Sequence, residues 1–143
     1  MDNSIKFKAR TMLNSYVIYK SDIKNIELEM QELKNNYELS ALSYGESSSK
    51  TNKISQESQD RIANKDMQLK KMQLEIDNNK INIAKIDNAV AILKEFERDV
   101  IVARYLTEPT SWTMVARKLG YANISCQTAE ERAVKKMIPL LFR

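Results

Sequence analysis

Apolar side chains recur between Ala9 and Tyr37 at alternating spacings of three and four positions. This spacing has a mean repeat of about 3.5 residues, which is the heptad pattern of helices that wind around one another. The positions that make up this first seam are Ala9, Met12, Tyr16, Tyr19, Ile23, Ile26, Met30, Leu33 and Tyr37. The pattern predicts a long helix from about Ser4 to about Leu39.

A second heptad seam runs through the middle of the chain. Its two series are Ile62, Leu69, Ile76, Ile83 and Val90, and Lys65, Met72, Asn79, Ile86 and Leu93. These positions predict a second helix from about Ser58 to Leu93 or beyond. Lys65 and Asn79 interrupt the second series, and a polar residue such as Asn79 in a seam costs stability but fixes register or strand number.

The stretch Ser40–Gln59 is rich in serine and contains Gly45 and Asn52, so it predicts a loop at about 40–59. This loop is either a mobile tip or a segment that contacts a partner. The two seams have matching lengths, and together they predict an antiparallel coiled-coil hairpin over 1–93 with left-handed supercoiling. The apolar residues Leu28, Leu74 and Ile81 lie off the main seam. They indicate dimerisation or the docking of a further helix.

A shorter helical pattern follows the second seam. Phe96, Val100 and Ala103 form one apolar face and predict a third helix over about Glu95–Leu106. Pro109 ends this segment, because a residue that precedes proline avoids the α region. Thr110 or Ser111 can then cap the next helix.

The stretch Trp112–Ala129 has the pattern of a helix-turn-helix, a motif that places its second helix in the major groove of DNA. Gly120 falls where the tight turn between the helices needs a residue that tolerates positive φ. The inward-facing positions of the two helices are Val115, Ala116, Leu119, Cys126 and Ala129. We expect Asn123 to cap the second helix, Cys126 to be a small buried hydrophobic residue, and Trp112 to lie in the core.

The outer face of the second helix carries the candidate base-reading residues. These are Ile124, Ser125, Gln127, Thr128 and Glu131. Gln127 is the strongest candidate, because a side-chain amide can pair bidentately with adenine. Ile124 can meet a thymine methyl group, and Glu131 can either accept from the amino group of cytosine or pair with Lys135 along its own helix.

Cations near the motif are candidates for contact with DNA phosphates. These are Arg117, Lys118, Arg132, Lys135 and Lys136. Their alternative role is to solvate a charged helix face. Glu130 and Glu131 lie among them, and two acids beside the phosphate backbone would lower the affinity for DNA. Either these acids sharpen base selection, or a partner supplies the missing affinity.

Composition narrows the possible functions. The 143 residues are 43% hydrophobic and 29% charged, with two glycines and two prolines, which is typical of long helices. The net charge of +4 is compatible with nucleic-acid binding without requiring it. One cysteine and no histidine make an intrachain disulfide impossible and a metal site, a cofactor or an enzymatic role improbable. We see no signal peptide and no transmembrane run, so we expect a cytoplasmic protein that is not bound to a membrane.

The C-terminal third resembles region 4 of sigma-70 family factors, the part that reads the −35 promoter element. The residues that carry this resemblance are Phe96, Val100, Arg104-Tyr105-Leu106, Ser111-Trp112, Val115-Ala116, Leu119-Gly120-Tyr121 and Ala133-Val134-Lys135-Lys136-Met137. The whole layout is similar to the RinA/ArpU-type late transcription regulators of phages of Gram-positive bacteria. The resemblance implies promoter binding and activation of late genes, with RNA polymerase as a further partner.

The sequence thus predicts an all-α protein with a coiled-coil hairpin over 1–93 and a helix-turn-helix domain over 94–143. Because a domain of about 50 residues is marginal alone, we expect it to pack against the hairpin base or a second subunit. The favoured function is sequence-specific binding of double-stranded promoter DNA, with the coiled coil as a route to a homodimer. A small terminase-like DNA-packaging subunit and a coiled-coil interaction module without DNA binding remain the alternatives.

Overall fold

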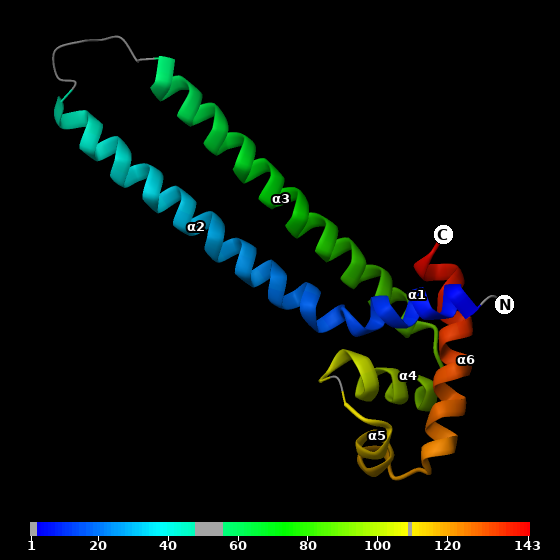
Figure 1. Ribbon diagram of the computed structural model, residues 1–143. Coiled ribbons are helices and arrows are strands. Elements are labelled where there is room, and N and C mark those ends of the chain that lie inside the picture. The colour runs from blue at the N-terminus through cyan, green and yellow to red at the C-terminus, as the bar shows by residue number, and fades with distance from the viewer. Residues whose placement is uncertain (1–2, 48–55, 109) are drawn as a thin grey trace. The chain divides into compact units, whose positions relative to one another are not determined.

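The computed structural model of the chain describes residues 3–47, 56–108 and 110–143. Every regular element in these ranges is helical, which confirms the all-α class (Figure 1). In chain order the elements are α1 (Asn3–Asn14), α2 (Tyr16–Ser47), α3 (Gln56–Ala91), α4 (Glu95–Ile101), the π-helix η1 (Val102–Leu106), α5 (Trp112–Leu119) and α6 (Asn123–Leu141).

The chain divides into two compact units. Asp22–Asn79 forms one of them, which we call the arm unit. Met1–Ser21 and Lys80–Arg143 form the other, which we call the terminal unit because both ends of the chain belong to it. This division differs from the predicted boundary between 1–93 and 94–143, because residues 1–21 and 80–93 belong with the C-terminal helices.

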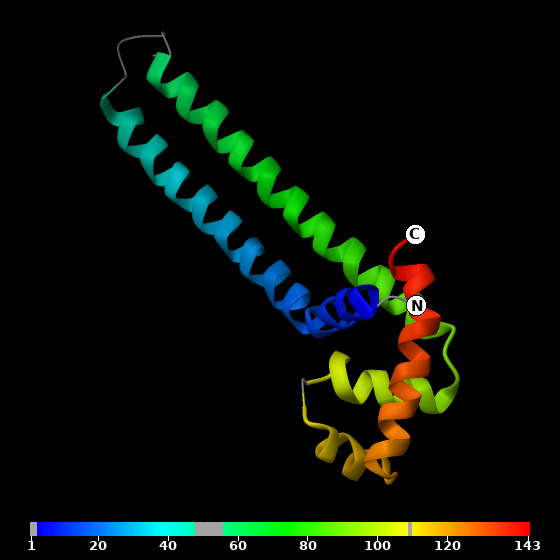
Figure 2. The same cartoon turned by 45° about the vertical axis from the view of Figure 1, so that its right-hand side comes forward.

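Within the arm unit, α2 and α3 lie side by side and run in opposite directions (Figures 1 and 2). Ile26 and Ile76, which are seam positions, are buried, whereas the off-seam residues Leu28 and Leu74 are 66% and 61% exposed. The seam residue Lys65 is half-buried, with its Nζ 4.1 Å from the centre of the Tyr37 ring. A cation–π contact therefore accommodates a charge on the apolar face. The seam residue Ile62 is 42% exposed, so not every seam position of α3 is covered.

The predicted loop at about 40–59 is too long. Helix α2 continues through Ser47 and α3 begins at Gln56, so 40–47 and 56–59 are helical. Ala41 and Leu42 are strong helix formers, and a single glycine such as Gly45 costs a helix only about 1 kcal/mol. The remainder of the predicted loop, 48–55, lies outside the described residues.

The first predicted helix, from about Ser4 to about Leu39, is interrupted at Ser15. The Ser15 hydroxyl donates to the Thr11 carbonyl oxygen at 2.9 Å, and the Thr11 hydroxyl donates to that of Phe7, also at 2.9 Å. The Ser15 N–H is shared between the carbonyl oxygens of Thr11 and Met12. Such bonds from a hydroxyl to the preceding turn bend helices, and they explain why α1 and α2 are separate elements.

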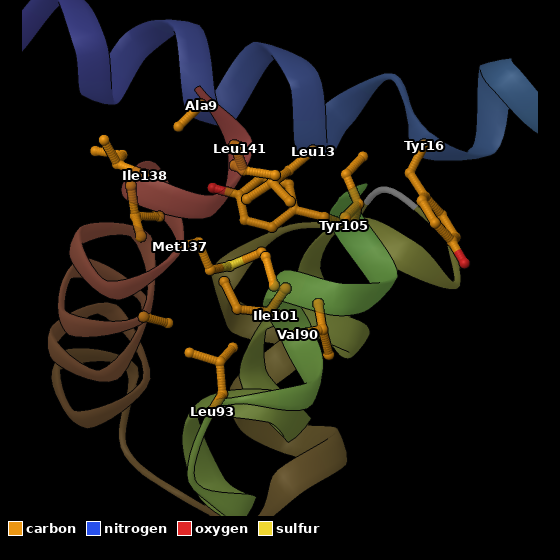
Figure 3. Packing of buried hydrophobic residues seen from close by; sticks show 14 residues of the cluster. Ala9, Leu13, Tyr16, Val90, Leu93, Ile101, Tyr105, Met137, Ile138 and Leu141 are labelled. Atoms are coloured by element: carbon orange, nitrogen blue, oxygen red, sulfur yellow. The ribbon is translucent and has the colours of Figure 1, made fainter. Parts of the chain in front are cut away.

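The core of the terminal unit joins segments from distant parts of the sequence (Figure 3). Its fully or almost fully buried residues include Ala9, Leu13, Tyr16, Ile86, Val90, Leu93, Ile101, Tyr105, Met137, Ile138 and Leu141. The N-terminal helix and the end of α3 therefore cover apolar residues of α4, η1 and α6. This packing supplies the burial that a 94–143 domain lacks by itself.

A second, smaller core joins α4 and η1 to the predicted helix-turn-helix. Val100, Ala103, Val115, Cys126 and Ala129 form it. The third predicted helix is present, but its last turn is the π-helix η1, in which the Thr107 N–H bonds to the Val102 carbonyl oxygen. Neighbouring residues of α4 and η1 thus serve different cores: Val100 and Ala103 face the second, and Ile101 and Tyr105 the first.

Local signals set the ends of α5 and α6. Of the two predicted caps, Thr110 and Ser111, the Ser111 hydroxyl caps α5 by accepting a hydrogen bond from the Met114 N–H. Gly120 has φ of 75° and ends α5, which confirms its predicted role in the turn. The predicted cap of α6 is wrong by one residue: Ala122 is the N-cap and Asn123 begins the helix. Helix α6 then continues through Pro139 to Leu141.

Candidate nucleic-acid interface

The first two turns of α6 present a polar outer face. Ser125, Gln127 and Thr128 are exposed there, and Ile124 is 76% exposed. Cys126 and Ala129, which alternate with them, are buried in the second core. Burial raises the pKa of the Cys126 thiol, so this residue behaves as a small hydrophobic side chain. Four of the five candidate base-reading residues are therefore on the outside of one short helical segment.

An open hollow of about 490 Å³ borders this face. Its lining residues are Arg10, Arg104, Tyr105, Trp112, Ile124, Gln127, Thr128, Glu130 and Glu131. Four of the five base-reading candidates therefore share one concave surface with two arginines. Ser125 is exposed but does not line the hollow.

Arg104 is a cation of this surface that sequence reasoning missed. Its guanidinium lies 4.6 Å from the centre of the Trp112 ring, and it donates to the Thr110 carbonyl oxygen. Trp112 packs against the second core, as predicted, and it also supports this arginine. The role of Arg104 could not be found from helix spacing, because the Thr110 carbonyl oxygen and the Trp112 ring that hold it belong to residues beyond η1.

Glu131 has a different place from the one predicted for a base reader. Its carboxylate accepts from Lys6 Nζ and, at 2.6 Å, from Arg10 Nη2. Both hydrogen bonds stabilise the charged carboxylate, first Lys6 and then Arg10, and they lower the pKa of Glu131. The alternative pair with Lys135 is not formed, because the Glu131 carboxylate bonds to Lys6 and Arg10 of α1 instead.

Glu130 is buried beside it and is held by two groups. Arg10 Nε donates to one of its oxygens at 2.8 Å, and the Tyr105 hydroxyl donates to the same oxygen at 3.2 Å. Burial, followed by the Glu130 charge, raises the pKa of Tyr105 to about 12. We call Lys6, Arg10, Glu130 and Glu131 the charge cluster. Glu130 and Glu131, the two acids expected to lower the affinity for DNA, are thus both paired with cations of α1.

The five predicted phosphate-binding cations divide into two groups. Lys136 donates to both oxygens of the buried Glu97 at 2.9 Å, so its charge compensates a carboxylate of the protein. The other four, Arg117, Lys118, Arg132 and Lys135, are exposed and form no ion pair within the described part of the chain. Arg117 and Lys118 also line a second hollow of about 330 Å³ with Met114. Four of the five therefore remain available to an external anion.

Comparisons with protein-family models, with curated proteins and with solved structures find no match to this chain. Within 3–47, 56–108 and 110–143, none of the helices is both long enough and apolar enough to cross a membrane. The chain's own residues are thus the basis for inferring its function.

Proposed function

We propose that this chain is a sequence-specific DNA-binding protein that regulates transcription. The observation that carries this proposal is the exposed polar face of Ser125, Gln127 and Thr128 at the start of α6. This face follows a short capped helix and a glycine turn, which is the order of elements in a helix-turn-helix. In this proposal α6 is the helix that enters the major groove.

Each exposed residue has a stated task in the proposed complex. Gln127 pairs with adenine, Thr128 and Ser125 bind a base edge or a phosphate, and Ile124 contacts a thymine methyl group. Arg117, Lys118, Arg132 and Lys135 bind phosphates on either side of the groove. Arg104, which shares the hollow with Gln127, is added to that group.

We propose a role in transcription because the residue pattern from Phe96 to Met137 resembles region 4 of sigma-70 family factors. Activation of phage late genes, with contact to RNA polymerase, follows from the same resemblance. Transcription in vitro from the bound sequence, with and without the protein, tests this part. An increase in full-length transcripts that depends on Gln127 supports it, and an unchanged yield contradicts it.

The arm unit supports a homodimer as part of the proposal. Beyond the covered seams it exposes Leu28, Leu39, Met67 and Leu74, each at more than half of its surface. Two α2–α3 pairs that associate as a coiled coil would cover such residues and place two α6 helices on DNA half-sites. The sedimentation mass distinguishes this regulator from a DNA-packaging subunit, which would form a high-order ring.

The decisive experiment selects bound duplexes from a random library at two salt concentrations and then measures their affinity. Gln127→Ala should weaken binding to the selected sequence roughly 10- to 100-fold, because a bidentate base contact is worth about 1–3 kcal/mol. Gln68→Ala makes the same chemical change at an exposed position of the arm unit and should bind normally. If the unaltered chain binds no duplex at low salt, the chain is not a DNA-binding protein.

A further inference from the structure

Helix α1 brings an excess of positive charge to the proposed DNA-reading helix. Between Asn3 and Asn14 it contains Lys6, Lys8 and Arg10 and no acidic residue. Helix α6 contains Glu130 and Glu131, one turn after Gln127. Lys6 and Arg10 are separated from these acids by 120 residues or more along the chain, yet they lie in hydrogen-bond contact with them.

In the charge cluster Arg10 bonds to both acids, and Lys6 bonds to Glu131 alone. Glu130 is buried and receives two N–H groups of Arg10, from Nε at 2.8 Å and from Nη2 at 3.2 Å. Glu131 is more open, with 38% of its side chain exposed, and it is bound by Lys6 and by Arg10. Because Glu130 and Glu131 line the same hollow as Gln127 and Thr128, an unpaired carboxylate there would repel a nearby phosphate.

We propose that Lys6 and Arg10 are positioning residues for DNA binding, which neutralise Glu131 and Glu130 beside the base-reading face. The inference rests on the proposed DNA-binding function. It makes α1 a part of the DNA-binding surface, although α1 lies at the opposite end of the sequence from α6. The partner that this surface fits is a polyanion, and the phosphodiester backbone of a duplex is the one proposed.

Lys6→Gln is the first test, because Lys6 is bound to the more exposed of the two acids. The change leaves the Glu131 charge without its ammonium partner, and DNA affinity in low salt should fall about three- to tenfold. Glu131→Gln should have the opposite effect and tighten binding. The double variant Lys6→Gln/Glu131→Gln should bind like the unaltered chain.

Lys8→Gln is the matched control. It removes the same charge from the same helix, but Lys8 is exposed and is not part of the charge cluster. Its effect should be smaller than that of Lys6→Gln, and Glu131→Gln should not reverse it. Thermal unfolding of every variant should stay within a few degrees of the unaltered chain, because Glu131 is partly open to solvent and keeps its bond to Arg10 when Lys6 is changed.

Several outcomes would overturn the inference. One is a Glu131→Gln variant that binds DNA less tightly or prefers a different base, because the carboxylate would then contact the DNA itself. Another is a Glu131→Gln variant with unchanged affinity, because the carboxylate would then have no influence on binding. Another is a Lys8→Gln variant as weak as Lys6→Gln. If Gln127→Ala loses binding in the same assay and Lys6→Gln does not, only this inference fails. If the unaltered chain binds no duplex, both proposals fail together.

Discussion

Helix α3 carries one heptad pattern along its length, and the two units cover that pattern in different ways. In the terminal unit, Ile86 and Val90 of α3, with Leu93 just after its end, belong to a core shared with α1, η1 and α6. In the arm unit, Leu69 and Met72 are only half-buried, and Ile76 is the one position of this helix segment that is buried. A periodic pattern therefore defines a covered face, while the depth of burial depends on how many elements meet there.

The largest expected difference is between the same truncation, leucine to alanine, in the cores of the two units. Leu13→Ala removes a fully buried side chain of the terminal unit and should lower the free energy of unfolding by about 2–5 kcal/mol. Leu33→Ala removes a half-buried side chain of the arm unit and should cost about 1 kcal/mol, because less apolar surface returns to water. Urea unfolding measures both. Equal losses would show that the two units are packed alike.

Tyr105 offers a test of the polar part of the terminal unit. Its pKa is raised to about 12, so the folded state keeps a proton that the unfolded state loses near pH 10. Its contribution to stability is therefore complete below about pH 10 and is lost as the pH rises to about 12. Tyr105→Phe should cost about 1 kcal/mol at neutral pH and show a weaker alkaline decline, measured by thermal unfolding at a series of pH values. Identical alkaline profiles would contradict this assignment.

The two glycines provide the smallest contrast, since one lies in each unit. Gly120→Ala in the terminal unit forces a β-carbon into left-handed backbone and should destabilise the protein by about 1 kcal/mol. Gly45→Ala in the arm unit replaces a helical glycine and should stabilise the protein by up to about 1 kcal/mol. Thermal unfolding detects the opposite signs. If Gly45→Ala also destabilised the protein, the expectation that alanine is favoured at this helical position would be wrong.

Local features of the sequence were the most predictable. The Ser111 cap, one of the two predicted, and the positive φ of Gly120 both follow from interactions within a few residues. The predictions that were wrong depended on finer backbone energetics. Bonds from the hydroxyls of Thr11 and Ser15 divide the first helix, and the π-helical turn at η1 was not expected.

The surroundings of the candidate site could be predicted only in part. Exposure of Ile124, Gln127 and Thr128 follows from the spacing of Cys126 and Ala129 on the inner face. The partners of Glu130 and Glu131 could not be found in this way, because Arg10 is 120 residues from Glu130 along the chain. Heptad spacing places Ala9 and Tyr16 in a seam, but it does not say which element covers α1.

The meeting of the first and last helices has a consequence for how the protein folds. A contact such as Lys6–Glu131 closes a loop of 125 residues, and closing so long a loop costs conformational entropy before any contact is gained. Helices α2 and α3 form through hydrogen bonds between residues four apart. Once they are formed, fewer residues between Ser21 and Lys80 are free to vary, so closing the loop costs less entropy. A chain that still lacks α6 has neither Glu130 nor Glu131 to pair with Arg10 and Lys6, and the core that α1 shares with η1 and α6 is incomplete.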